Sequence, residues 1–281
     1  MHELKAESPV VLTQPAPTLG RAIVVTSGKG GVGKTTTTAN LGTALAQRGA
    51  KVALIDADVG LRNLDILLGL ENRVRYHLLD VLEERVTLDD ALVTDKHSPT
   101  LFLLAAAQSR EKDEVDMEKM RAVVAELRTK FDYVLIDSPA GIERGFQNAV
   151  IGAKEAIVVC TPEVSAVRDV DRVVGLLGSA FRPQLIVNRL RPLLVRKGKM
   201  LSVDDVNAIL RLPLLGVIAD EPEIIVSTNR GEPLALRSEG ATANAYRAIA
   251  ARLAGDDVAA PMVEAKESLF GRLGSFFGGR R

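Results

Sequence analysis

The chain has little cysteine and no long apolar run, and each absence narrows the possibilities. Its single cysteine, Cys160, ends an apolar run and is interpreted as a small buried core residue, without a disulfide or a metal cluster. No apolar run reaches the length of about 18 residues that suggests a bilayer-spanning helix. The N-terminus lacks the apolar core of a signal peptide. These features predict a protein of the reducing cytoplasm.

An excess of one charge is also missing. The 36 Lys and Arg residues are balanced by 36 Asp and Glu residues. The net charge therefore offers no bulk attraction to DNA or to an anionic membrane, and only a local patch could supply one. Hydrophobic residues make up 47% of the sequence and charged residues 26%, which is the balance of a soluble globular protein. The 281 residues allow one large domain or two small ones.

A glycine-rich turn near the N-terminus carries the clearest chemical signal. It follows the apolar run Arg21–Thr26, precedes a helical pattern, and matches the spacing G-x-x-x-x-G-K-[ST] with Gly28, Gly33, Lys34 and Thr35. Glycines allow successive backbone N–H groups to face phosphate oxygens, and the following helix directs its positive end at the same anion. Lys34 would bind the β- and γ-phosphates and the Thr35 hydroxyl would bind Mg²⁺. The alternative is a turn that matches by coincidence.

Two buried strands end in aspartates that could serve this loop. Residues 51–56 run into Asp58, and residues 133–137 end at Asp137. Acidic residues just past the carboxyl end of a strand lie where open α/β sheets bind ligands. A hydrophobic strand that ends in Asp also has the form of the Walker B element, which organises Mg²⁺ in P-loop enzymes. Together with the loop, these aspartates predict an ATP and Mg²⁺ site.

Strands and helices alternate over residues 21–255. Further strands are expected at 101–105, 157–161, 185–189 and 214–218, and helical patterns at 74–94, 115–128, 164–177, 202–210 and 242–253. His77 within the first pattern is interpreted as structural, and Ser202 as a helix cap. The alternation predicts an α/β fold, a single-domain doubly wound and mainly parallel sheet with helices on both faces. Residues 1–20 are expected to be a disordered extension and residues 256–266 a flexible linker.

The C-terminal residues 267–281 predict an amphipathic helix. At 100° per residue, one stripe about 120° wide contains Leu269, Phe270, Leu273, Phe276 and Phe277. Three of the seven phenylalanines of the chain lie in this glycine-rich end, which favours an interfacial helix on a membrane. So short a helix is marginal in water, so one copy should bind weakly and two linked copies far better. Docking on its own domain and a disordered end are the alternatives.

An early lysine in the loop indicates a particular family. With Lys29 the loop reads K-G-G-x-G-K-[ST], and the chain resembles the deviant-Walker-A (ParA/MinD) family of P-loop ATPases there and at residues 56–65, 137–143 and 161–172. The resemblance covers about residues 21–255 and the tail, and it is closer to the branch that determines the division septum. It implies a homodimer with ATP sandwiched at its interface. The dimer would recruit a division inhibitor (MinC-like) to the inner face of the cytoplasmic membrane, and hydrolysis, stimulated by a topological activator (MinE-like or other), would release it.

The resemblance also implies residue roles around the phosphates. The loop residues that would bind the nucleotide are Gly28, Lys29, Gly30, Gly31, Val32, Gly33, Lys34, Thr35 and Thr36. Lys29 would reach the nucleotide of the partner subunit, Asp58 would orient the attacking water, and Asp137 would support Mg²⁺ through a water molecule. Taken alone, Lys29 could be a solvated turn residue and Asp58 a carboxylate that fixes its loop.

Residues near the base follow from the same resemblance. Asn188 would recognise adenine with Arg189 beside it, and Asp220 and Glu221 correspond to the base-binding loop, where Ala219 replaces the proline that relatives often carry. The charged start of the helix at 164–177 would form a dimer or partner surface, or only a solvated face; its residues are Arg168, Asp169, Asp171 and Arg172.

Two other functions within the family stay open. A DNA-segregating ParA-type ATPase would need a basic dimer surface and no apolar tail, so the zero net charge and the phenylalanine stripe speak against it. A flagellar-number regulator would share the fold and the tail. Residues 60–65 and 137–143 favour the division branch.

Overall fold

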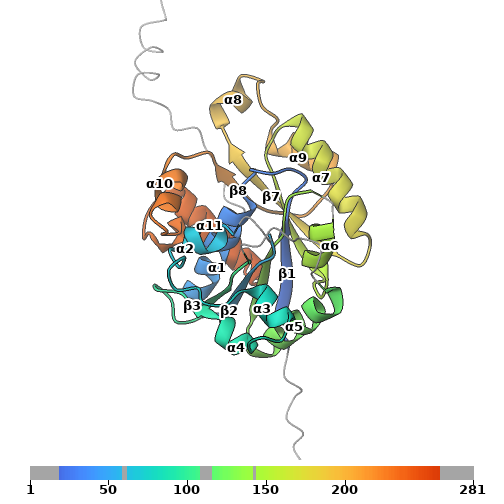
Figure 1. The fold of residues 1–281 in the computed structure, drawn as a ribbon. Helices are drawn as coiled ribbons and strands as arrows, with labels where there is room; N and C mark the ends of the chain where they lie inside the picture. Colours follow the sequence, from blue (N-terminus) through green and yellow to red (C-terminus); the bar gives the residue numbers. More distant parts are fainter. Residues whose placement is uncertain (1–18, 59–61, 108–115, 142–143, 260–281) are drawn as a thin grey trace, which may run out of the picture.

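The computed structural model describes residues 19–58, 62–107, 116–141 and 144–259, which are coloured in Figure 1. The linker beyond residue 259, the predicted membrane helix and residues 1–18 of the predicted extension lie outside these ranges. Within them, no helix combines the length and the apolar character needed to cross a membrane.

One eight-stranded sheet forms the centre of the molecule, in the order β3-β4-β2-β5-β1-β6-β7-β8. Neighbouring strands are parallel except for β3, which pairs antiparallel with β4 at the edge. This confirms the predicted mainly parallel α/β sheet. The strands are β1 (Arg21–Thr26), β2 (Val52–Asp56), β3 (Val93–Thr94), β4 (Leu101–Leu104), β5 (Tyr133–Asp137), β6 (Glu155–Cys160), β7 (Arg182–Leu190) and β8 (Leu214–Ala219).

Helices cover both faces of the sheet (Figure 1). One layer contains α1 (Lys34–Gln47), α2 (Leu64–Leu68), α10 (Glu223–Asn229) and α11 (Ala241–Leu253). The other contains α3 (Leu78–Leu82), α4 (Leu88–Ala91), α5 (Met117–Lys130), α6 (Arg144–Val150), α7 (Val164–Leu177) and α9 (Val203–Leu210), with α8 (Pro192–Arg196) at its margin. Because successive strand residues face opposite sides, Val24 packs under one layer while Ile23 and Val25 pack under the other. Continuous apolar strands are therefore buried on both faces.

The helical pattern predicted at 74–94 is wrong as a single helix. The chain forms α3 and α4 there, followed by the edge strand β3. Glu84 has a left-handed backbone (φ 60°), which ends α3, and the side chain of Thr87 caps α4 by accepting from the Asp90 N–H. His77 caps α3, and its Nδ1 lies 2.8 Å from Asp80 Oδ2, so its structural role is confirmed.

Caps also fix other helix ends. The Asp116 side chain accepts from the backbone N–H groups of Glu118 and Lys119, so α5 begins two residues later than predicted. Ser202 caps α9 with a reciprocal Asp205 contact, as expected. Cys160 is fully buried, as predicted.

The strand order places the predicted site. β1 lies between β5 and β6. Strands β2 to β5 lie on one side of β1 within the sheet and strands β6 to β8 on the other, so the strand order reverses at β1. In open α/β sheets such a reversal leaves a crevice beyond the carboxyl ends of the strands. The glycine-rich loop follows β1 at this edge, with the ends of β2 and β5 beside it.

Candidate functional site

The glycines of the loop are required by its backbone and by its neighbours. Gly31 and Gly33 have positive φ angles of 76° and 98°, a conformation that side chains disfavour. A Cβ on Gly28 would lie 2.3 Å from the carbonyl carbon of Asp169 in α7, and one on Gly33 would lie 2.3 Å from Asn188 Nδ2. The loop is therefore pressed between α7 and the end of β7, and its open side is free to face an anion.

Lys34 and Asp137 form the buried centre of the site. Lys34 begins α1 and is only 7% exposed, and Asp137 ends β5 at 1% exposed. Burial lowers the pKa of Lys34, while the negative charges of Asp137 and Asp58 oppose that shift. Burial raises the pKa of Asp137 to about 8, and the negative charge of Asp56 adds to this increase. Hydrogen bonds from Thr35 and Thr38 act in the opposite direction. A buried cation beside a carboxylate and two hydroxyls is suited to phosphate and a divalent cation.

The donor set of this centre fits Mg²⁺ bound together with phosphates. Mg²⁺ usually takes one or two protein groups and fills its other positions with phosphate oxygens and water. Thr35 and Asp137 supply a hydroxyl and a carboxylate in hydrogen-bonding contact with each other. The described ranges, this site included, contain no group of three or more His, Cys, Asp and Glu residues that could hold a metal ion by itself. A metal in this site would therefore depend on the bound nucleotide.

Asp56 is a site residue that the sequence reasoning missed. It is 1% exposed, and its carboxylate accepts backbone N–H groups from Asp58 at 3.1 Å and from Asn63 and Leu64 at 3.2 Å each. Burial raises its pKa to about 6, although these hydrogen bonds oppose the shift. Asp56 thus anchors both ends of the loop that carries Asp58. The sequence carries a signal for this role, because Asp56 is the last residue of a continuous apolar run, and that strand is buried throughout.

Asp58 and Lys29 lie on the accessible side of the centre. Asp58 is half-buried, and its charge acts on Lys34. Lys29 is exposed, and its backbone carbonyl accepts a 2.8 Å hydrogen bond from Ser27 Oγ. The structure therefore brings Asp58 towards the phosphate loop and leaves Lys29 exposed.

A cavity of about 420 Å³ adjoins the loop and reaches the ends of β7 and β8. Its lining residues are Gly33, Thr36, Asn188, Arg189, Arg191, Asp220, Glu221, Pro222, Ile224, Ile225 and Tyr246. The size suits a ligand with a planar ring, since ligand cavities usually measure about 300–1,000 Å³. The lining includes all four residues for which the family resemblance predicts a place near the base: Asn188, Arg189, Asp220 and Glu221.

Asn188 presents a polar atom that fits a base. Its Nδ2 donates to the Val32 carbonyl oxygen at 2.7 Å, which fixes the amide at the phosphate loop. Its Oδ1 is buried and has no hydrogen-bond partner among the described residues. A buried acceptor without a partner is costly, and an amino group of a nucleobase could satisfy it. Arg189 beside it is exposed and has a left-handed backbone (φ 57°), a strained geometry that is common at ligand sites.

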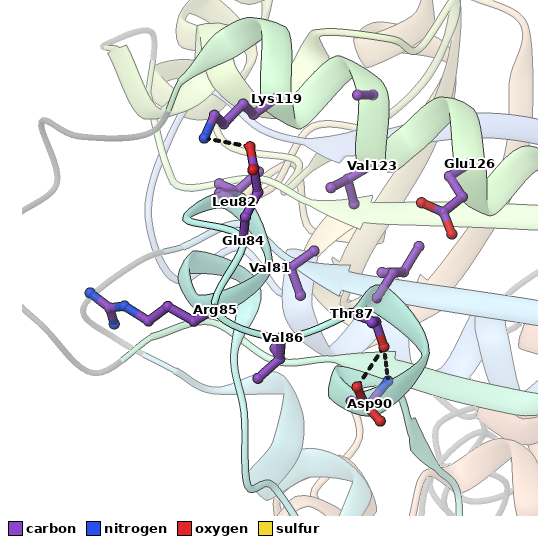
Figure 2. Close-up of a pocket in the computed structure, with 12 residues that line it drawn as sticks. Val81, Leu82, Glu84, Arg85, Val86, Thr87, Asp90, Lys119, Val123 and Glu126 are labelled. Atoms are coloured by element: carbon purple, nitrogen blue, oxygen red, sulfur yellow. Dashed lines mark hydrogen bonds and ion pairs between the residues drawn. The ribbon is translucent and has the colours of Figure 1, made fainter.

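A second cavity, of about 580 Å³, lies between α3, α4 and α5 (Figure 2). It has an apolar floor that includes Val81 and Val123, and an ion pair of 3.0 Å joins Lys119 and Glu84 across its rim (Figure 2). It contains none of the predicted site residues.

The predicted residues of α7 line neither cavity. On α7, Arg168, Asp171 and Arg172 are exposed, and Asp169 is half-buried and lies 3.7 Å from Arg172. They could therefore form a surface, and their role stays a prediction. The predicted membrane residues Leu269, Phe270, Leu273, Phe276 and Phe277 lie outside the described residues.

Comparisons with known proteins agree with this geometry. Residues 23–234 match the family described as the CobQ/CobB/MinD/ParA nucleotide binding domain. The chain is 57% identical over 243 residues to the septum site-determining protein MinD of Synechocystis sp., which covers 85% of this chain and 91% of that protein.

Solved structures give the same result. The MinC:MinD cell division protein complex of Aquifex aeolicus matches with a TM-score of 0.81 and 50% identity, covering 85% of this chain and 98% of that one. The septum site-determining protein MinD of Pyrococcus horikoshii, complexed with Mg-ADP, matches with a TM-score of 0.77 and 33% identity, covering 84% and 98%. A phosphate loop, a buried lysine with a carboxylate and a base-sized cavity are thus found in a chain that aligns with these proteins over nearly their whole length. The chain therefore belongs to the MinD group of the CobQ/CobB/MinD/ParA nucleotide-binding family.

Proposed function

We propose that this protein is an ATPase that dimerises on ATP, binds the cytoplasmic face of the cell membrane and positions the division septum. The observation that carries the proposal is the convergence of Lys34, Asp137 and Asp58 on one glycine-rich loop. The close similarity to septum site-determining relatives supports the division role over the DNA-segregating and flagellar alternatives.

The residues have complementary tasks in ATP hydrolysis. Lys34 and the loop N–H groups bind the phosphates, and the base enters the cavity beside Asn188. Thr35 and Asp137 would hold Mg²⁺, which supplies positive charge at the phosphates when it is bound. Asp58, held in place by Asp56, orients the attacking water. Its negative charge near a phosphate is unfavourable, so it suits a slow hydrolysis that a partner stimulates.

Lys29 would complete the site of the other subunit. It is exposed on its own subunit, whereas Lys34 already occupies the buried position. A cation added where negative charge spreads over the γ-phosphoryl oxygens lowers the barrier to transfer. Supplying that cation from a partner links hydrolysis to dimerisation.

Recruitment of a division inhibitor of the MinC type is supported by the solved MinC:MinD complex of Aquifex aeolicus. Its binding surface would be α7, whose exposed charged residues lie next to the phosphate loop through Gly28 and Asp169. A MinE-like or other activator would act at the dimer to stimulate hydrolysis.

Membrane binding would use the C-terminal helix predicted at residues 267–281. Five large apolar side chains bind weakly in one copy, and two copies on one dimer gain from effective concentration. ATP would thereby favour attachment, and hydrolysis would favour release.

Sedimentation with liposomes tests this proposal. Full-length protein and a chain truncated after Lys266 are compared in ATP and in ADP. The full-length chain should pellet with liposomes in ATP and much less in ADP, and the truncated chain should stay in the supernatant. Equal pelleting of both chains would overturn the membrane role.

A further inference from the structure

The loop of residues 220–222 bounds the base cavity, and side chains from outside the loop hydrogen-bond to it. The Thr242 hydroxyl, at the start of α11, donates to Glu221 Oε2 at 2.7 Å. Arg191, just after β7, donates from Nε to Asp220 Oδ2 at 2.5 Å. Thr242 is 2% exposed, whereas Arg191 and its ion pair lie near solvent. The contact to Thr242 is less exposed to solvent, and it is therefore the stronger determinant of where the loop lies.

The same helix also lines the cavity. Tyr246 follows Thr242 by four residues, so both side chains lie on one face of α11. Tyr246 is fully buried and lines the cavity, as Glu221 does. The hydrogen bond between Thr242 and Glu221 thus ties the loop to the helix that carries Tyr246.

The hydrogen bond between Thr242 and Glu221 joins two segments that are distant in the sequence. Glu221 follows β8, and Thr242 lies 21 positions further along the chain. The N-terminus of α11 has no side-chain cap, because its N-cap residue, Gly240, has no side chain. A carboxylate brought in from another element near a helix N-terminus is favourable. The contact therefore joins the loop to the first turn of α11.

We propose that Thr242 is a positioning residue for the nucleobase: through Glu221 it fixes the loop 220–222 and so determines the affinity for the adenine end of ATP. The inference rests on the proposed nucleotide function. Thr242 does not line the cavity itself, so its effect passes through Glu221. Without the bond, the loop can move away from Tyr246 and the base loses its fitted cavity.

Four full-length variants test this proposal by ATP titration and by steady-state hydrolysis in Mg²⁺. Thr242→Val keeps the shape and removes the donor, while Thr242→Ser keeps the donor. Glu221→Ala removes the acceptor. Thr129→Val is the matched control, because the hydroxyl of Thr129 also makes a 2.7 Å hydrogen bond but lies on α5, away from the cavity.

Thr242→Val should weaken ATP binding by up to about tenfold, because part of the binding free energy must then restore the loop position that the lost hydrogen bond to a charged group held. KM should rise more than kcat changes. Thr242→Ser should stay within about twofold of the parent, and Thr129→Val should not differ from it. Inhibition by inorganic triphosphate, which has no base, should be the same in the parent and in Thr242→Val. The double variant Thr242→Val with Glu221→Ala should be no weaker than the weaker single variant.

Three outcomes would overturn the inference. Thr242→Val could bind ATP like the parent, Thr242→Ser could be as weak as Thr242→Val, or triphosphate inhibition could weaken in parallel with ATP binding. If Thr242→Val does not fold, Glu221→Ala decides by the same comparison of ATP with triphosphate. A parent protein that fails to bind ATP would instead contradict the proposed function.

Discussion

Asp56 and Asp137 lie opposite each other in register at the carboxyl ends of β2 and β5. Both are 1% exposed, and the negative charge of Asp56 helps to raise the pKa of Asp137. Two buried carboxylates side by side destabilise the folded chain unless cations or hydrogen-bond donors compensate. Asp56 has three backbone donors, whereas Asp137 relies on hydroxyls and on Lys34. The site is thus prepared for positive charge.

The first prediction concerns the pH dependence of stability without nucleotide. The folded pKa of Asp137, about 8, lies above the usual 3.8, so the folded chain keeps a proton that the unfolded chain has released. The contribution of Asp137 to the free energy of unfolding should therefore fall as the pH rises from about 4 to about 8. Asp137→Asn should remove this loss and be more stable than the parent at pH 8, by on the order of 1–3 kcal/mol. Urea unfolding of parent and variant at several pH values measures it, and a stability difference between the two that does not change over this range would contradict it.

The second prediction concerns Asp56. Asp56→Asn loses the charge and one of the two acceptor oxygens that hold the 58–64 loop. Asp58 should then be misplaced, and kcat should fall by up to about a hundredfold, the usual effect of a shift near 1 Å. ATP affinity, set by Lys34 and the cavity, should change far less. Single-turnover hydrolysis with a separate ATP titration checks this split, and an unchanged kcat would argue against a positioning role.

The third prediction compares the two loop lysines. Lys34→Ala should weaken ATP binding by about ten- to a hundredfold, because a buried charge-assisted contact to phosphate is lost. The Lys29→Ala monomer should have nearly the same affinity for ATP as the parent monomer, because Lys29 is exposed in its own subunit. Calorimetric titration at low protein concentration separates the two. Tight ATP binding by Lys34→Ala would show that the loop assignment is wrong.

The fourth prediction concerns Gly28. An added methyl group would meet the backbone of α7 at Asp169 and Val170, at 2.3 and 2.6 Å. Gly28→Ala should lower the free energy of unfolding by about 1–3 kcal/mol, as overpacking does. Gly30→Ala serves as the control, because its nearest neighbour would be 3.7 Å away. Equal stability of the two variants in chemical unfolding would contradict the close approach of loop and helix.

Much of the fold could be predicted because both faces of the parallel strands are buried. Apolar runs such as 133–137 give a continuous signal, and the glycine spacing identifies the loop. The break between α3 and α4 could not be predicted, since it depends on a left-handed Glu84, which sequence rarely signals. The contact between Thr242 and Glu221 was equally hidden, because it joins a loop to a helix only after the sheet has formed.

The central claim is that two subunits share their sites, with Lys29 acting on the partner and Asp58 on its own nucleotide. Mixing Lys29→Ala protein with Asp58→Ala protein tests it most directly. In a heterodimer, one site would keep both Asp58 and the partner's Lys29, while the other would lack both. ATP hydrolysis should therefore reappear in the mixture of two inactive proteins, and should depend on total protein concentration. A mixture as inactive as either variant alone would contradict the account, because both residues would then act within one subunit.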